Sequence, residues 1–179
     1  MRKISVIQFC KKCLFVVLCL SLSACIIQPI QPENIHDPAL QKIHHAFTET
    51  VTKALNDPNE DWTSGWLGNM WVNFHEGKQR GLCYQWKYRV HAGVKSTVRE
   101  QGWELTSIVI NKGADGEHHA VVVYNPRQLQ ASQLLNASTT QPVFVLDAWR
   151  QGMPDIYPIS EWLQLARHVY VPAQLVPIN

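Results

Sequence analysis

Residues 82–111 read LCYQWKYRVHAGVKSTVREQGWELTSIVIN, and their hydrophobic period changes at Gly102. Before this glycine, apolar residues recur at steps of four, which is typical of an amphipathic helix; they are Leu82, Trp86, Val90, Val94 and Val98. After it, β-branched and apolar residues fill Trp103 to Asn111, which indicates a strand. The stretch therefore predicts a helix over residues 82–101 that leads into a sheet.

The same signals extend the pattern in both directions. Upstream, Asp37 and Pro38 offer a helix cap and a first-turn proline, and the apolar stripe behind them predicts a helix that ends near residues 57–58. Downstream we expect strands at 119–124 and 142–147, a helix from Ser160 to about His168, and a weak strand at 169–171. Helices first and strands later predict an α+β domain with a mainly antiparallel sheet.

Between the two predicted helices, residues 59–80 have no clear period and are rich in aromatic residues. Trp62, Trp66, Trp71 and Phe74 alternate with glycines. Such side chains could line a substrate groove or stack on a sugar, and they could equally cap the core. The sequence leaves both interpretations open.

The first 25 residues have the features of an export signal. A basic start is followed by a short apolar run and by Leu22-Ser23-Ala24-Cys25, which resembles the lipobox of bacterial lipoproteins. The resemblance implies a signal peptide over residues 1–24, a lipidated (palmitate-bearing) Cys25 and a tether over residues 25–37, with one globular domain over residues 38–179. Ile26 after the cysteine implies sorting to the outer membrane, with the domain facing the periplasm.

The composition describes a globular chain: 179 residues, 46% of them hydrophobic and 17% charged. Without the four basic residues of the signal, 12 basic residues stand against 14 acidic ones, a net charge of −2. A mature chain of that charge, with no basic cluster, has no electrostatic footprint for phosphate backbones, so we expect no nucleic-acid partner.

Only one of the five cysteines, Cys83, follows Cys25 in the sequence. An exported domain with a single thiol cannot form an internal disulfide. Such a thiol is a buried core residue, an intermolecular partner or a reactive group.

The surroundings of Cys83 favour reactivity. It lies in the first turn of a predicted helix, where free N–H groups and the helix dipole favour a thiolate. His119 begins one predicted strand and Asp147 ends another. If these strands are neighbours, a histidine and a carboxylate project toward the face on which the helix packs. Cys83, His119 and Asp147 then have the residue types of a nucleophile, a base and the group that orients the base.

These segments resemble a known family. Residues 81–86 (GLCYQW) resemble the nucleophile segment of the bacterial transglutaminase-like cysteine peptidases, within the papain-like superfamily, and residues 119–123 and 145–149 resemble their histidine and aspartate strands. The resemblance covers about residues 81–149. It implies a papain/transglutaminase-like fold, with a nucleophile helix packed on the sheet, in which Cys83 is the nucleophile, His119 the base and Asp147 its orienting partner.

Three details stay open in the sequence. His118 competes with His119 as the base, and strand alternation sends the two side chains to opposite faces. The oxyanion donor could be the Cys83 backbone N–H or the side chain of Gln79. Zinc is the other use of a thiol with His118 and His119, although the paired ligand spacing of zinc motifs is missing.

Two functions from different classes follow. The first is a thiol-dependent amide hydrolase or acyltransferase that acts on a peptide or protein in the cell envelope and needs no cofactor. The second is a non-catalytic lipoprotein that uses the same fold to bind a protein or glycan partner through its tryptophan segment.

Overall fold

The computed structural model describes residues 27–74, 77–166 and 168–178. The predicted signal and the lipobox cysteine Cys25 lie outside these residues. Within the described part, no helix is long and apolar enough to cross a membrane.

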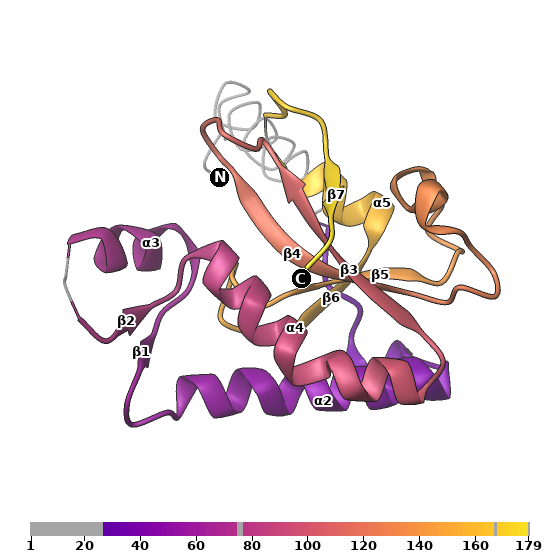
Figure 1. Ribbon diagram of the computed structural model, residues 1–179, viewed down its shortest axis with the longest axis horizontal. Coiled ribbons are helices and arrows are strands. Elements are labelled where there is room, and N and C mark those ends of the chain that lie inside the picture. Colours follow the sequence, from indigo (N-terminus) through magenta and orange to yellow (C-terminus); the bar gives the residue numbers. More distant parts are fainter. Residues whose placement is uncertain (1–26, 75–76, 167, 179) are drawn as a thin grey trace, which may run out of the picture.

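The fold is α+β, with helices packed against a five-stranded antiparallel sheet (Figure 1). The strands lie in the order β6-β5-β4-β3-β7. Their bounds are β3 (Glu104–Ile110), β4 (His118–Tyr124), β5 (Val143–Asp147), β6 (Asp155–Pro158) and β7 (Gln174–Val176). The helices are α2 (Pro38–Leu55), α3 (Gly65–Phe74), α4 (Cys83–Glu100) and α5 (Ile159–Trp162), with short 3-10 turns η1 (Pro32–Asn34), η2 (Ala131–Asn136) and η3 (Leu163–Leu165).

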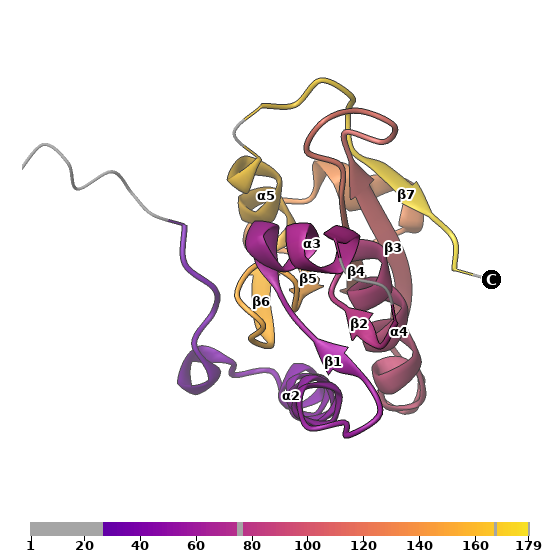
Figure 2. The ribbon, with the colours of Figure 1, turned by 90° about the vertical axis from the view of Figure 1, so that its left-hand side faces the viewer.

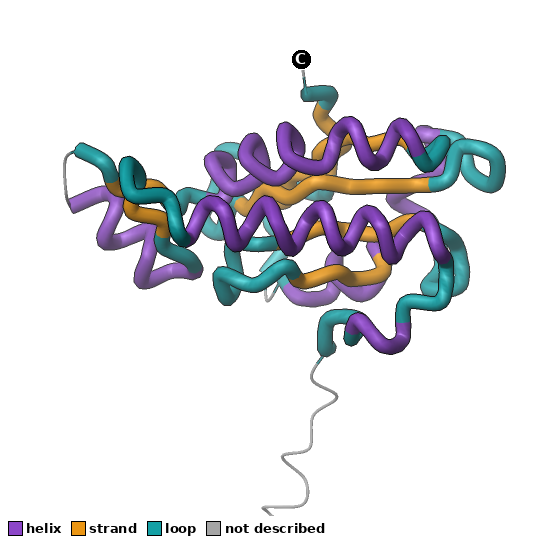
Figure 3. Tube along the Cα trace, turned by 90° about the horizontal axis from the view of Figure 1, so that it is seen from below, coloured by secondary structure: helices purple, strands orange, loops and turns teal. Residues whose placement is uncertain are grey.

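The two long helices form where the apolar stripes predicted them. Asp37 caps α2 by accepting a hydrogen bond from the Leu40 backbone N–H at 2.9 Å, as the sequence predicted. Figure 3 shows α2 and α4 side by side across the strands. Gly93 permits this approach, because a Cβ there would lie 2.1 Å from Thr50 Oγ1.

The sheet has a buried core on each face. On one face Val121, Val123 and Leu146 pack against α2 and α4. On the other, Val122 and Val145 pack against η2 and α5, where Trp162 is fully buried. The domain therefore has three layers, with α2 and α4 on one face of the sheet and α5 and η2 on the other; Figure 2 shows α5 on the side of the sheet away from α2.

Several elements differ from the sequence predictions. Residues 65–74 form helix α3 rather than an irregular segment, and two short parallel strands, β1 (Asp61–Trp62) and β2 (Gln79–Arg80), flank it. Strand β6 was not predicted, the last strand lies at 174–176 rather than at 169–171, and the helix after Ser160 ends early. Part of the predicted tether packs on the domain, since Ile35 is buried and the Ile30 N–H donates to the Ile156 carbonyl of β6.

Candidate active site

Cys83 is the first residue of α4 and is 7% exposed. The turn before it is fixed by Gln85, whose Oε1 accepts from the backbone N–H groups of Gly81 and Leu82 at 2.9 and 3.0 Å. Gly81 has φ +149°, and a Cβ there would lie 2.3 Å from Thr63 Oγ1, so only glycine fits. Among the described residues, no acceptor is assigned to the Cys83 backbone N–H. The thiol therefore lies beside free helix N–H groups.

His118 is the first residue of β4 and is 4% exposed. Its ring contacts two indoles, with ring centroids 4.6 Å from Trp149 and 5.4 Å from Trp162. Its Nε2 lies 2.7 Å from Asp147 Oδ2. Since a carboxylate can only accept, Nε2 carries the proton.

The other ring nitrogen of His118 is the atom available to the thiol. Nδ1 is buried and has no hydrogen-bond partner within the described residues, and the Cys83 side chain is near enough to be one of the groups that raise the pKa of His118. The Cys83 thiol also donates a long hydrogen bond of 3.7 Å to the Glu117 carbonyl, next to His118 in the chain. A neutral Nδ1 can accept the proton of this thiol, and a protonated Nδ1 can donate to the thiolate.

Asp147 ends β5 and is 2% exposed. Its Oδ2 accepts from His118 and also from Trp162 Nε1 at 2.8 Å and Arg150 Nε at 3.2 Å. Its Oδ1 accepts from the Trp149 backbone N–H at 3.1 Å. The buried carboxylate thus has four donors, which is how a protein accommodates a charge out of water.

These contacts set the charge of the pair. Burial alone would raise the pKa of Asp147, but the charge and hydrogen bond of His118, with Arg150 and Trp162, lower it to about 2. Burial would likewise lower the pKa of His118, but the charge of the Asp147 carboxylate, the hydrogen bond that this carboxylate accepts from Nε2, and the neighbouring Cys83 side chain outweigh burial and raise it. The contacts therefore favour a carboxylate beside an imidazolium.

The predicted partnership of His119 with Asp147 is wrong. Val121 pairs with Leu146 across β4 and β5, and the next step of this register puts Asp147 beside Ala120. His118 shares the face of Ala120, whereas His119 points to the opposite face, where its Nε2 lies 2.5 Å from Glu117 Oε1. The His118–Asp147 pair also lies on the face of α5 and not, as expected, on the face of α4.

Gln79, the candidate side-chain oxyanion donor, lies in β2. Its Oε1 is buried and has no hydrogen-bond partner among the described residues. Within that part of the chain, no hydrogen bond joins Gln79 to Cys83 or His118. The structure brings together Cys83, His118 and Asp147, and it leaves His119 and Gln79 outside that group.

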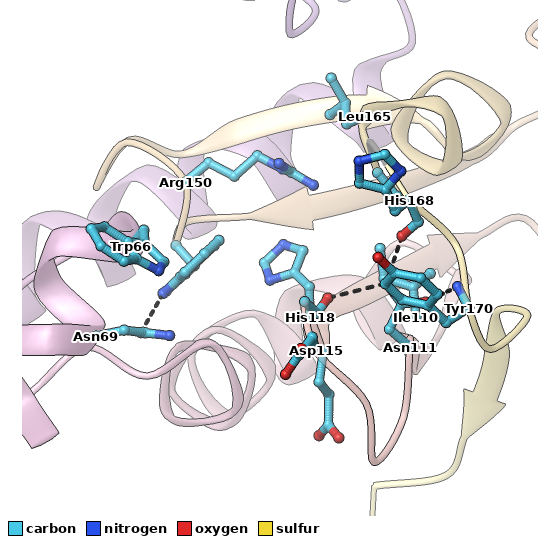
Figure 4. Close-up of a pocket in the computed structure, with 14 residues that line it drawn as sticks. Trp66, Asn69, Ile110, Asn111, Asp115, His118, Arg150, Leu165, His168 and Tyr170 are labelled. Carbon is cyan, nitrogen blue, oxygen red and sulfur yellow. Dashed lines mark hydrogen bonds between the residues drawn. The ribbon is translucent and has the colours of Figure 1, made fainter.

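A pocket of about 560 Å³ opens in front of His118 (Figure 4). Its wall combines aromatic, acidic and basic side chains from α3, the β3–β4 turn, the turn after β5 and the C-terminal segment. They include Trp66, Asp115, Glu117, Trp149, Arg150 and Tyr170. In the described part of the chain, no three side chains of the metal-binding types are placed to hold an ion.

Sequence reasoning missed three residues that surround the pair. Trp149, Arg150 and Trp162 all contact His118 or Asp147. Trp149 and Arg150 come two and three residues after Asp147, and that proximity in the chain was the available signal. Trp162 comes from α5, fifteen residues after Asp147, and no spacing pointed to it.

Comparison with known proteins identifies no relative of this chain. The chain matches no protein-family model, no curated protein and no solved structure.

The His118–Asp147 pair predicts how the free energy of unfolding changes with pH. Because the folded pKa of Asp147 lies at about 2, below its ordinary 3.8, its stabilising contribution is present above pH 4 and is lost as the pH falls toward 2. We expect a loss of about 2 kcal/mol of unfolding free energy over that range. His118 acts in the opposite sense, since its raised pKa removes stability as the pH rises above 6.5.

Urea unfolding from pH 2 to pH 9 measures both effects, the loss of stability at low pH from Asp147 and the loss above pH 6.5 from His118. In Asp147→Asn the decline between pH 4 and pH 2 should be shallower than in the wild type by about 2 kcal/mol. An equal decline of the unfolding free energy in the two proteins between pH 4 and pH 2 would show that Asp147 has no depressed pKa.

Proposed function

We propose that this protein is a thiol-dependent amide hydrolase in which Cys83 is the nucleophile, His118 the general base and Asp147 the residue that orients His118. One observation carries the proposal: His118 is held through Nε2 by a buried carboxylate, so that Nδ1 is left for the thiol at the start of α4. A nucleophile, a base and an orienting group in this order are the elements of covalent catalysis.

The reaction proceeds in two halves. His118 Nδ1 takes the proton of the Cys83 thiol, and the thiolate attacks the amide carbonyl carbon. The carbonyl oxygen becomes an oxyanion beside the Cys83 backbone N–H at the helix terminus. The C–N bond then breaks, and the leaving amine takes the proton from His118. Water, deprotonated by His118, hydrolyses the thioester and regenerates the thiol. An amine in place of water would make the same site an acyltransferase.

The fold we propose is papain/transglutaminase-like. The support is the order of the elements, with a cysteine at the N-terminus of a helix followed by antiparallel strands that contribute a histidine and an aspartate. The site differs from the expected family pattern in its base, because His118 takes the place we expected for His119.

The proposed setting comes from the sequence. A lipid on Cys25 would hold the domain at the outer membrane, facing the periplasm, and the substrate would then be a peptide or protein of the cell envelope.

The test is the reactivity of Cys83 as a function of pH. The full chain, in detergent, is pulsed with iodoacetamide, and alkylation is followed by mass spectrometry of tryptic residues 81–87, which lie between Arg80 and Lys87 and contain Cys83 alone. An ordinary thiol with a pKa of about 8.5 is almost entirely protonated at pH 6 and reacts slowly. We expect Cys83 to react fast at pH 6 and this reactivity to be lost in His118→Ala.

His119→Ala is the matched control, because it removes a neighbouring histidine that contacts Glu117 instead of Asp147. It should retain the acid reactivity of the wild type. Equal alkylation profiles in His118→Ala and His119→Ala, both with an ordinary midpoint, would overturn the proposal.

A second candidate function is partner binding without catalysis. The observation in its favour is α3, where Trp66 and Phe74 are 68% and 79% exposed. Exposed aromatic residues on one helix are typical of a protein or glycan contact. An ordinary alkylation profile in the wild type would favour this function over hydrolysis.

A further inference from the structure

We propose that Arg150 binds a carboxylate of the substrate, so that the amide cleaved at Cys83 belongs to a peptide with a carboxylate next to the scissile bond. The inference rests on the proposed function and adds the class of substrate to it.

Arg150 uses only one part of its guanidinium within the protein. Its Nε donates to Asp147 Oδ2 at 3.2 Å. No partner is assigned to either terminal nitrogen among residues 27–74, 77–166 and 168–178. The side chain is 25% exposed and lines the pocket. Figure 4 shows the guanidinium extending into the pocket beside the His118 ring.

The turn that carries Arg150 is fixed from two sides. Trp149 Nε1 donates to Asn69 Oδ1 of α3 at 2.9 Å, and the Trp149 carbonyl accepts from the Gly65 backbone N–H at 2.5 Å. The Gly152 N–H closes the turn on the Ala148 carbonyl at 3.1 Å. Together with the bond to Asp147, these contacts hold the guanidinium in place before a ligand arrives, and such preorganisation reduces the entropy lost on binding.

The charges of the pocket are separated. Asp115 and Glu117 line the pocket from the β3–β4 turn, and Figure 4 shows Asp115 on the side of His118 away from Arg150. Hydrogen bonds from the Gly113 N–H and from His119 lower the pKa of Glu117, which keeps it anionic. A ligand carboxylate is therefore attracted to the Arg150 side and repelled from the opposite side.

A purely structural role explains only the Nε contact of Arg150. The two terminal nitrogens provide up to four N–H donors, and a guanidinium binds a carboxylate best when two donors face two oxygens. Their position in the pocket, on the same wall as the proposed base His118, matches a carboxylate close to the amide that would be cleaved.

Two alkylating reagents of nearly equal size test this directly. Iodoacetate carries a carboxylate and iodoacetamide a neutral amide in the same position. The ratio of their rates at Cys83, again measured on residues 81–87 of the full chain, is divided by the same ratio for the chain unfolded in urea. We expect Arg150→Gln to lower this normalised ratio about tenfold, as for the loss of one charge-assisted hydrogen bond.

Two further variants test whether the effect depends on where the positive charge lies and on the shape of the guanidinium. Arg99→Gln removes the same charge from the exposed C-terminal end of α4 and should keep the wild-type ratio. Arg150→Lys keeps the charge but loses the fork of the guanidinium, so its ratio should fall between those of the wild type and Arg150→Gln. Because an imidazolium also attracts iodoacetate, a high ratio in the wild type alone does not support the inference.

The outcomes distinguish this inference from the proposed function. An unchanged ratio in Arg150→Gln, with iodoacetamide reactivity still dependent on His118, would overturn the carboxylate site alone. Loss of the His118 dependence would overturn the proposed function whatever the ratio. If Arg150→Gln fails to fold, wild-type protein is protected from iodoacetamide with N-acetylglycine or with N-acetylglycinamide. Equal protection by the acid and the amide would then overturn the inference.

Discussion

Asp147→Ala is expected to lower the free energy of unfolding by about 3–5 kcal/mol, the usual cost of removing one partner from a buried ion pair. The substitution leaves the Arg150 cation, the Trp162 indole N–H and the His118 ring without their shared acceptor. The buried donors of His118 and Trp162 are then desolvated without a hydrogen bond in return. Urea denaturation at pH 7 measures the loss.

Asp155→Ala is the matched control for this prediction. Asp155 pairs with Asp147 across β5 and β6 and is 9% exposed. Burial and the nearby charge of Asp147 raise the pKa of Asp155 to about 6, so its carboxylate is disfavoured where it lies. We expect its removal to cost much less than the removal of Asp147. Equal losses in the two variants would show that Asp147 is not the centre of the network.

Trp86→Ala is expected to cost about 3–5 kcal/mol, as large-to-small changes of buried aromatic residues do. Trp86 is 1% exposed, its ring centroid lies 4.5 Å from that of Trp62, and its Nε1 donates to the Thr63 carbonyl at 2.7 Å. The side chain joins the second turn of α4 to the segment between β1 and α3. Urea denaturation is again the measurement.

Two variants divide this effect into its parts. Trp86→Phe retains most of the buried ring and removes the donor to Thr63, for which we expect a loss of about 1–3 kcal/mol. Tyr88→Ala removes an exposed ring from the same helix and should cost less than about 1 kcal/mol. A loss for Trp86→Ala no larger than for Tyr88→Ala would contradict the anchoring role.

The long helices could be predicted from sequence because their stripes were long and their ends marked. Asp37 and Pro38 fixed the start of α2, and Gly102 marked the end of α4. Strand β6 could not be found in this way, since four residues that are all buried show no alternation and end in a proline. Helix α3 was missed because its apolar side chains are exposed, so it has no clear polar face.

The candidate site shows the same limit more sharply. Alternation established that His118 and His119 point to opposite faces, but it did not tell which face holds Asp147. That choice depends on the register between β4 and β5, and a shift of one residue would exchange the two histidines. Register is set by pairing between segments that are distant in the chain, which a single sequence does not display.

The two outer strands of the sheet have a consequence for self-association. An uncovered strand edge is a template on which another chain can add, and this leads to fibrils. Here β7 has three residues and is followed by Pro177, while β6 has four and ends in Pro158. On the outer side of β6, the Ile156 carbonyl already accepts a hydrogen bond from the Ile30 N–H. Both borders of the sheet are thus short and blunted, which protects the domain from edge-to-edge aggregation.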